Sequence, residues 1–281
     1  MTGPDFIVIG AMKSGTTTLA DQLAAQDGVF VTTPKEPNYF SDDAVYAKGP
    51  DWYAALFDPA PPSALRGEAS THYTKRPTYP DTVARLHDAC PELRLIYMIR
   101  NPVERAVSHY IHEWSERRVG GRIDLAFAQM PELVDYGRYA YQLDPYLEAF
   151  GQAAIHLTSL EQITQDPQAE FARIARFLDL PPGAAWKSDL GASNVSARRI
   201  RTFPLRRVLV DNPVMRPLRQ LLIPKSVRVW VWNRLTMKKR PELPQDLRVE
   251  LEQTFLEDRE DLARVFPGHP ALDLCYPFAS T

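Results

Sequence analysis

Cysteine is scarce in this sequence of 281 residues: only Cys90 and Cys275 are present, and they are far apart in the chain. Neither belongs to a C-x-x-C pair or a Cys/His cluster, so the sequence predicts neither a disulfide framework nor a zinc site. Long apolar runs are also absent, and the first short one, residues 6–9, is too short for a signal peptide or a membrane span. These absences favour a cytoplasmic protein with no metal site.

Extremes of composition are missing as well. Hydrophobic residues make up 44% of the chain and charged residues 24%, with 13 glycines and 25 prolines, which excludes disordered and fibrous proteins. The length is sufficient to bury a sizeable core in one domain or two.

Charge is unevenly distributed, although the net charge is only −2. Residues 198–240 contain thirteen Lys or Arg and a single acid, Asp211, so this segment carries +12 and the remainder of the chain −14. One interpretation is that an anionic ligand or partner binds near this segment. The alternative is a solvated surface that balances the acidic remainder.

Short apolar runs alternate with helical patterns, which is typical of βαβ units and a parallel sheet. Asn101 followed by Pro102 is a favourable helix start, because Asn caps the first turn and proline fits its first position. We expect strands at residues 6–9, 29–32, 65–69, 95–99 and 155–160. We expect helices at residues 17–26, 51–57, 81–90, 102–117, 137–150, 166–178 and 243–266. The sequence thus predicts an α/β fold.

A glycine-bounded loop lies between the first expected strand and the first expected helix, with the sequence Gly10-Ala11-Met12-Lys13-Ser14-Gly15-Thr16-Thr17. In such a loop, successive backbone N–H groups and the positive end of the helix converge on an anion, and glycines allow a close approach. Lys13 adds a cation, while Thr16 and Thr17 add hydroxyl donors. The alternative is a turn whose glycines serve only packing.

The order of residues in this loop differs from the Walker A pattern, in which the Lys follows the second Gly and the next hydroxyl binds Mg²⁺. Here Lys13 precedes Gly15, and Thr16 occupies the place of the Lys. Arg100 follows the expected strand at residues 95–99, where a P-loop NTPase often has a metal-binding acid. The pattern therefore favours a metal-free nucleotide site over an ATPase.

The loop resembles the 5′-phosphosulfate-binding loop of sulfotransferases that use 3′-phosphoadenosine 5′-phosphosulfate (PAPS). Residues 95–110, LIYMIRNPVERAVSHY, resemble the second hallmark of that family. The resemblance implies a P-loop-like three-layer fold, with a central parallel sheet flanked by helices, and a 3′-phosphate site at Arg100 and Ser108. It also implies that the 5′ side of the nucleotide is bound by Ala11, Met12, Lys13, Ser14, Gly15, Thr16 and Thr17.

Three further segments resemble the heparan sulfate sulfotransferases more than the enzymes that sulfate small phenols. They are residues 35–40 (KEPNYF), 48–53 (KGPDWY) and 67–73 (GEASTHY). Together the matches cover roughly the first 160 residues in order. We therefore expect a sulfotransferase of bacterial type that forms one domain over residues 1–281.

Within that domain we expect a core at about residues 5–180, a basic segment at about 190–242 and a C-terminal helix at about 243–266. The family completes its 3′-phosphate site with a basic loop after the core. Its counterpart here contains Arg198 and Arg199 but lacks the usual Gly, which leaves open whether one of these or a neighbouring Arg contacts the nucleotide. The rest of the basic segment has two interpretations, a lid over an anionic acceptor and a surface that contacts a membrane with a lipid-linked acceptor.

Sulfuryl transfer, like phosphoryl transfer, depends on in-line positioning and electrostatic stabilisation. We expect Lys13 to stabilise the charge that develops on the bridging oxygen. The resemblance implies that Glu36 removes the acceptor proton, and Pro37 keeps residue 36 out of helical backbone. His72 is the alternative base, because small-molecule sulfotransferases use a His and an imidazole titrates near neutral pH.

Other polar residues are candidates for the acceptor side. Lys35 is expected to steer an anionic acceptor or to contact the sulfuryl group, and Glu68 resembles an acid near the acceptor site of glycan sulfotransferases. His109 and His112 lie one helical turn apart, next to Glu113. No further metal ligand is evident, so we interpret these residues as ordinary helix surface rather than a metal site.

The prediction is therefore a PAPS-dependent sulfotransferase that moves a sulfuryl group to the hydroxyl of a sugar, metabolite or lipid-linked alcohol without a metal. A P-loop kinase or nucleotide phosphotransferase is the first alternative, and the position of Lys13 argues against it. The second is a non-catalytic protein that binds an anion or nucleic acid through the basic segment. Strong DNA binders rarely carry such an acidic remainder, so we expect no nucleic-acid partner.

Overall fold

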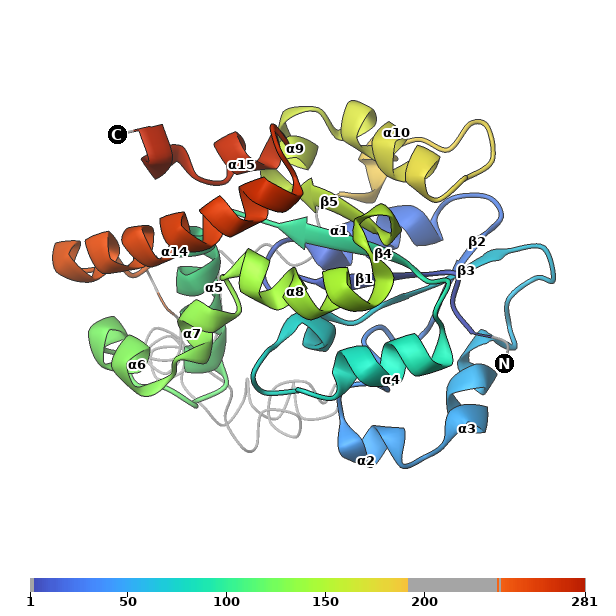
Figure 1. Cartoon of the computed structure of the whole chain (residues 1–281), viewed down its shortest axis with the longest axis horizontal. Coiled ribbons are helices and arrows are strands. Elements are labelled where there is room, and N and C mark those ends of the chain that lie inside the picture. The colour runs from blue at the N-terminus through green and yellow to red at the C-terminus, as the bar shows by residue number, and fades with distance from the viewer. Residues whose placement is uncertain (1–2, 192–236, 238, 281) are drawn as a thin grey trace, which may run out of the picture.

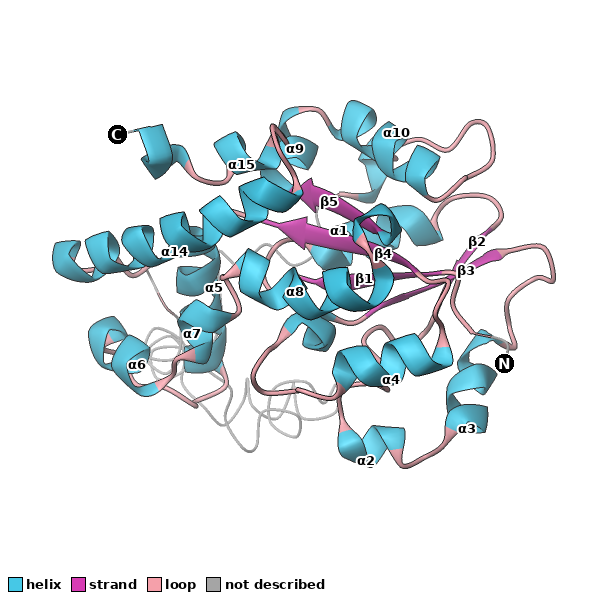
Figure 2. Ribbon diagram, in the orientation of Figure 1, coloured by secondary structure: helices cyan, strands magenta, loops and turns pink. Residues whose placement is uncertain are grey.

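Five strands form a parallel sheet in the computed structural model, which describes residues 3–191, 237 and 239–280. The strand order is β2-β3-β1-β4-β5, and every neighbouring pair is parallel (Figure 2). The strands are β1 (Phe6–Gly10), β2 (Val29–Val31), β3 (Leu65–Ala69), β4 (Arg94–Ile99) and β5 (Ile155–Ser159). Each lies within one residue of its predicted boundaries, so the predicted parallel sheet is confirmed.

The helices that the hydrophobic period indicated are also present. They are α1 (Thr16–Ala24), α3 (Pro50–Ala54), α4 (Thr82–Ala89), α5 (Pro102–Ser115), α8 (Tyr139–Phe150), α10 (Pro167–Phe177) and α14 (Gln245–Val265). The helices not predicted are α2 (Asp43–Tyr46), α6 (Ile123–Gln129), α7 (Glu132–Asp135), α9 (Leu160–Gln165) and α15 (Ala271–Leu274). These span only four to seven residues, too few for a helical period to show in the sequence.

Alternating side chains of the central strands divide the core into two layers. Ile7 and Ile9 of β1 join the side packed by α4, α5, α8 and α14, whereas Phe6 and Val8 join the side packed by α1 and α10. Figure 1 looks onto the first of these faces, with α4 and α8 in front of the sheet. Since strand side chains alternate between faces, one buried strand supplies both layers. The predicted three-layer α/β fold is confirmed.

The start of α5 follows from its first residues. The Asn101 side chain accepts a hydrogen bond from the backbone N–H of Glu104 at 3.0 Å, and Pro102 occupies the first helical position. The same turn is held from α9, where Glu161 Oε1 accepts the N–H of Asn101 at 2.9 Å. The direction in which α5 leaves the sheet is therefore fixed on two sides.

The connections diverge between β1 and β4. The chain leaves β1 through α1 toward β2, and it leaves β4 through α5 toward β5, on the opposite side of the sheet. In parallel α/β sheets, such a switch point creates a crevice beyond the carboxyl ends of the strands. The loops after β1, β2, β3 and β4 carry the predicted site residues, and all of them emerge at this edge.

No helix in the described part of the chain is both long and apolar enough to cross a membrane.

We predict that Gly67→Ala destabilises the pairing of β3 with β1. A Cβ at Gly67 would collide with the buried Phe6 ring. Overpacking of this kind costs about 1–3 kcal/mol, so the urea unfolding midpoint should fall. Gly120→Ala is the matched control, because nothing lies within 4 Å of a Cβ there. Equal midpoints for the two variants would contradict the packing described.

Candidate functional site

The loop between β1 and α1 presents backbone donors at the sheet edge. Gly15 is the N-cap of α1 and provides no side-chain cap, so the N–H groups of the first helical turn face the loop. Lys13 has a φ of 70°, in the left-handed region that non-glycine residues seldom adopt. Thr16 and Thr17 begin the helix. The predicted succession of strand, glycine-bounded loop and helix start is thus present.

Both glycines of the loop are required by close packing. A Cβ at Gly10 would collide with Thr74 Oγ1, whose hydroxyl donates to the Ile9 carbonyl at 2.9 Å. Gly15 has a φ of 94°, and a Cβ there would lie 3.1 Å from Met98 Cε. The packing interpretation of these glycines therefore holds, and the same contacts bring the loop close to β4.

Arg100 follows β4 and contacts the loop of residues 10–17 between β1 and α1, which we call the phosphate loop. Its Nη1 donates to the Lys13 carbonyl at 3.3 Å, and its backbone N–H and carbonyl both bond to the Tyr139 hydroxyl. Two motifs that are 87 residues apart in the chain thus meet at the switch point. Lys13 and Arg100 are therefore adjacent in the fold.

Arg240 lies close to Arg100, which the sequence did not predict. Its Nη2 lies 2.6 Å from Glu104 Oε2, and the same carboxylate oxygen lies 3.8 Å from Arg100 Nη2. Glu104 therefore holds two guanidinium groups beside the end of β4. The sequence marked Arg240 only as part of a basic run and contained no signal for this pairing.

Two serine hydroxyls at the site are buried without a hydrogen-bond partner among the described residues. Ser14 lies in the phosphate loop, and Ser108 lies on α5, two turns after Arg100. Buried hydroxyls are normally hydrogen-bonded, so each of these has unused capacity. A phosphate oxygen is an acceptor that would satisfy them, and the residues present therefore fit a nucleotide with phosphates at both ends.

Glu36 lies against the phosphate loop through Lys35. Lys35 Nζ donates to Thr17 Oγ1 at 3.0 Å and to Glu36 Oε1 at 3.1 Å. Thr71 Oγ1 donates to the same carboxylate oxygen at 3.3 Å. Glu36 has a φ of 59°, and its N–H bonds to the Ala69 carbonyl, so the residue before Pro37 is indeed outside right-handed helical backbone. With 32% of its side chain exposed, the carboxylate remains open to a ligand.

His72 follows Thr71 in the chain, but its ring has other contacts than the Glu36 carboxylate does. Its ring stacks on Tyr79 at 4.9 Å, and its Nδ1 is buried without a hydrogen-bond partner among the described residues. Burial, followed by the charge of Lys75, lowers the pKa of His72 to about 4. The imidazole is therefore neutral at neutral pH. Contact with the phosphate loop distinguishes Glu36 from His72.

Glu68 lies beneath the acceptor side rather than on it. Its side chain is fully buried, accepts a hydrogen bond from Tyr53 and another from Ser70 Oγ at 2.5 Å. Ser70 Oγ in turn accepts the N–H of Asn38 at 3.2 Å. Burial raises the pKa of Glu68, although the bonds from Ser70 and Tyr53 oppose that rise. In this structure Glu68 braces the loop that carries Glu36.

The expectation that His109 and Glu113 lie on a helix surface is wrong, because both side chains are buried. His109 Nε2 lies 3.3 Å from Glu113 Oε1, and Arg118 Nη1 lies 2.9 Å from Glu113 Oε2. The His109 ring also stacks on Tyr136 at 5.5 Å. These residues form a buried polar cluster at the end of α5. In the sequence, His109 and Glu113 lie among other polar residues, so nothing there indicated that they are buried.

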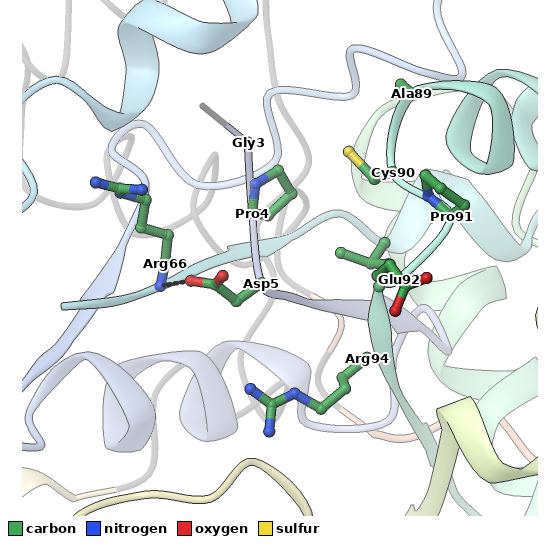
Figure 3. A pocket seen from close by; sticks show the side chains of 10 residues that line it. Gly3, Pro4, Asp5, Arg66, Ala89, Cys90, Pro91, Glu92 and Arg94 are labelled. Carbon is green, nitrogen blue, oxygen red and sulfur yellow. Dashed lines mark hydrogen bonds between the residues drawn. The ribbon is translucent and has the colours of Figure 1, made fainter. Parts of the chain in front are cut away.

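A cavity of about 620 Å³ lies at the opposite, amino edge of the sheet (Figure 3). It is lined by the segment before β1, by Arg66 of β3 and by the start of β4. Asp5 accepts the Arg66 N–H at 2.7 Å, and Arg94 pairs with Asp179 at 3.0 Å. This cavity is remote from the strand ends that carry the site.

The predicted contacts of the basic segment with the nucleotide are not tested by the structure. Arg198 and Arg199, with most of the basic segment, lie outside the described residues. Within the described ranges, no group of three or more His, Cys, Asp and Glu side chains is arranged to hold a metal ion.

Comparisons of this chain with known proteins agree on one family. The model of the sulfotransferase domain matches residues 3–202. Mouse (Mus musculus) heparan sulfate glucosamine 3-O-sulfotransferase 3B1 is 31% identical over 193 residues, which are 63% of this chain and 46% of that protein. The bifunctional heparan sulfate N-deacetylase/N-sulfotransferase 1 of Caenorhabditis elegans is 24% identical over 276 residues, 92% of this chain and 29% of that protein. The chain thus spans about half the length of the first relative and less than a third of the second.

A solved structure has the same fold over nearly the whole chain. The sulfotransferase from Alicyclobacillus acidocaldarius superimposes with a TM-score of 0.69 and covers 97% of this chain and 99% of its own, at 22% identity. At that identity the likeness concerns the fold.

Proposed function

This chain belongs to the sulfotransferase domain family, and from that premise we propose that it transfers a sulfuryl group from PAPS to an acceptor hydroxyl. One observation carries the proposal. Lys35 joins the first turn of α1 to the Glu36 carboxylate, so an anion-binding loop and an exposed base meet at the switch point of the sheet. This is the juxtaposition that group transfer from a nucleotide to a hydroxyl requires.

The loop and the start of α5 would hold the two ends of the nucleotide. Loop amides from Ala11 to Gly15, with the hydroxyls of Ser14, Thr16 and Thr17, would bind the 5′ side. Arg100, Ser108 and Arg240 would bind the 3′-phosphate, since forked guanidinium donors suit phosphate oxygens. PAPS would supply an activated sulfuryl group, and 3′,5′-adenosine bisphosphate would leave through its 5′-phosphate oxygen.

Lys13 and Glu36 would act on the reacting groups themselves. Lys13 places a cation at the loop, where negative charge develops during transfer. Glu36 accepts the proton of the acceptor hydroxyl, and the donors Lys35 and Thr71 hold one of its oxygens while the other remains available.

The acceptor we propose is a sugar hydroxyl. The relatives named above are a glucosamine 3-O-sulfotransferase and an N-sulfotransferase of heparan sulfate, which supports a glycan over a phenol. Contact with a membrane surface through the basic segment stays a prediction. Sedimentation with anionic and neutral liposomes distinguishes it from a lid over an anionic acceptor.

We predict that 3′,5′-adenosine bisphosphate, in EDTA, raises the melting temperature more than AMP or ATP does. A ligand that binds only the folded state adds about 2.7 kcal/mol at a hundredfold excess over its Kd. Arg100→Ala and Arg240→Ala should each reduce the preference for the bisphosphate over AMP. Arg248→Ala is the control, because Arg248 pairs with Glu252 on α14. Stabilisation by Mg-ATP alone would instead indicate a kinase.

We predict that Lys13→Ala lowers the transfer rate at least a hundredfold. Loss of one preorganised donor of this kind costs about 3 kcal/mol in the barrier. The rate is measured with radiolabelled PAPS and an acceptor that the wild-type protein turns over. Lys48→Ala provides the control, since Lys48 lies over the Trp52 ring. An unchanged rate for Lys13→Ala would remove Lys13 from the catalytic groups.

We predict that Glu36→Gln loses turnover, whereas His72→Ala retains most of it. The carboxylate contacts the loop through Lys35, while the imidazole has a pKa of about 4 and stacks on Tyr79. Both variants are compared at saturating PAPS, with the bisphosphate thermal shift as a test of folding. The reverse pattern would transfer the role of base to His72.

A further inference from the structure

The turn that connects β4 to α5 at residues 100–101, here called the Arg100 turn, is held by side chains from outside it. The backbone N–H of Arg100 donates to the Tyr139 hydroxyl at 3.3 Å, and the same hydroxyl donates to the Arg100 carbonyl at 2.7 Å. The next N–H, that of Asn101, donates to Glu161 Oε1 at 2.9 Å. Three consecutive backbone groups are therefore bound by two side chains that lie 39 and 60 residues further along the chain.

Tyr139 is itself fixed by the elements around it. It is the first residue of α8, and its side chain is fully buried. Asp258 of α14 accepts the N–H groups of Ala140 and Tyr141 at 2.9 Å and 3.0 Å, which satisfies two of the donors at the start of the helix. The Tyr139 ring packs edge-on against the Tyr97 ring of β4, with 5.9 Å between their centres. The hydroxyl is therefore held in one place against the end of β4.

The chemistry of this hydroxyl matches both of its partners. A neutral phenol donates one hydrogen bond and accepts another, as the carbonyl and the N–H of Arg100 require. Burial raises the pKa of Tyr139, so the hydroxyl keeps its proton. A phenylalanine would keep the buried ring but leave both backbone groups of Arg100 without these bonds.

The Arg100 side chain is held less firmly than its backbone. Its Nη1 lies 3.3 Å from the Lys13 carbonyl, and its Nη2 lies 3.8 Å from Glu104 Oε2. Both distances exceed the usual range of about 2.7–3.2 Å for such hydrogen bonds, and 22% of the side chain is exposed. The fixed backbone is therefore what limits the positions that the guanidinium can reach.

We propose that Tyr139 is a positioning residue for the nucleotide site, and that its hydroxyl sets the preference for a nucleotide with a 3′-phosphate over one without. This rests on the proposed function, in which Arg100 binds the 3′-phosphate. Because Tyr139 is fully buried, it acts on the ligand only through Arg100. A donor that is already in place binds more tightly than a mobile one, since less conformational freedom is lost on binding.

Tyr139→Phe should weaken the binding of 3′,5′-adenosine bisphosphate and leave the binding of AMP unchanged. Loss of the hydroxyl removes two neutral hydrogen bonds from the turn, so the Kd for the bisphosphate should rise about five- to tenfold. AMP has no 3′-phosphate for Arg100 to bind, so its Kd should stay the same. Both constants are measured by isothermal titration calorimetry in EDTA, and the melting temperature of each variant is recorded in parallel.

Tyr146→Phe is the matched control. Tyr146 lies on the same helix, is also buried, and donates its hydroxyl to a backbone carbonyl at 2.6 Å, that of Tyr73 in the helical turn η2 (Thr71–Thr74). This variant should lose stability as Tyr139→Phe does but keep the wild-type ratio of the two Kd values. A merely structural role of Tyr139 would lower the melting temperature in both variants and leave the ratio unchanged in both.

A double-mutant cycle tests whether Tyr139 acts through Arg100. In the Arg100→Ala background no guanidinium is left to position. Adding Tyr139→Phe should therefore leave the Kd for the bisphosphate where Arg100→Ala alone puts it, because two residues that act as one unit give effects that do not add.

An unchanged ratio of the two Kd values in Tyr139→Phe, or single effects that add in the double variant, overturns the proposal. Failure of the proposed function looks different: the wild-type protein then shows no preference for the bisphosphate over AMP, or Arg100→Ala retains that preference in full. An altered ratio in Tyr146→Phe would also count against a specific role for Tyr139.

Discussion

Parallel pairing of β1 with β3 on one side and β4 on the other is the constraint on which the site depends. β1 is buried along its whole length, and its two neighbours end at the same edge of the sheet. The phosphate loop, the Arg100 turn and η2 all begin where these strands stop. Contacts from Ala11 N to the Met98 carbonyl and from Thr74 to the Ile9 carbonyl then fasten the loops to their neighbours.

Backbone strain is concentrated at the same edge. Lys13, Glu36 and Asn38 all have positive φ values, a conformation that costs of order 1–3 kcal/mol at a non-glycine residue. The buried Glu68 offsets part of this cost, because it fixes Ser70, which accepts the Asn38 N–H. The expected acceptor-side acid is thus better understood as the support of the loop that carries the base.

Two buried hydroxyl groups at the candidate site have no hydrogen-bond partner among the described residues. They are the hydroxyls of Ser14 and Ser108. Glu170, by contrast, accepts from Thr158 and Gln162, whereas Tyr97 and Tyr276 have further buried hydroxyls without a partner among the described residues. What distinguishes the two serines is their place, in the loop after β1 and on the helix after Arg100, where a phosphate oxygen would satisfy them.

The sequence by itself determined the features that are local in the chain: the strands and longer helices, the loop from Gly10 to Thr17, and the turn that presents Arg100. Hydrophobic period, glycine placement and helix caps act over a few residues, so they can be recognised without a fold. Only the tertiary structure decided that Glu68 is covered, that His109 and Glu113 are buried, and that Arg240 reaches Glu104, 136 residues away. Burial and such pairings depend on which elements pack together, and no short stretch of sequence contains that information.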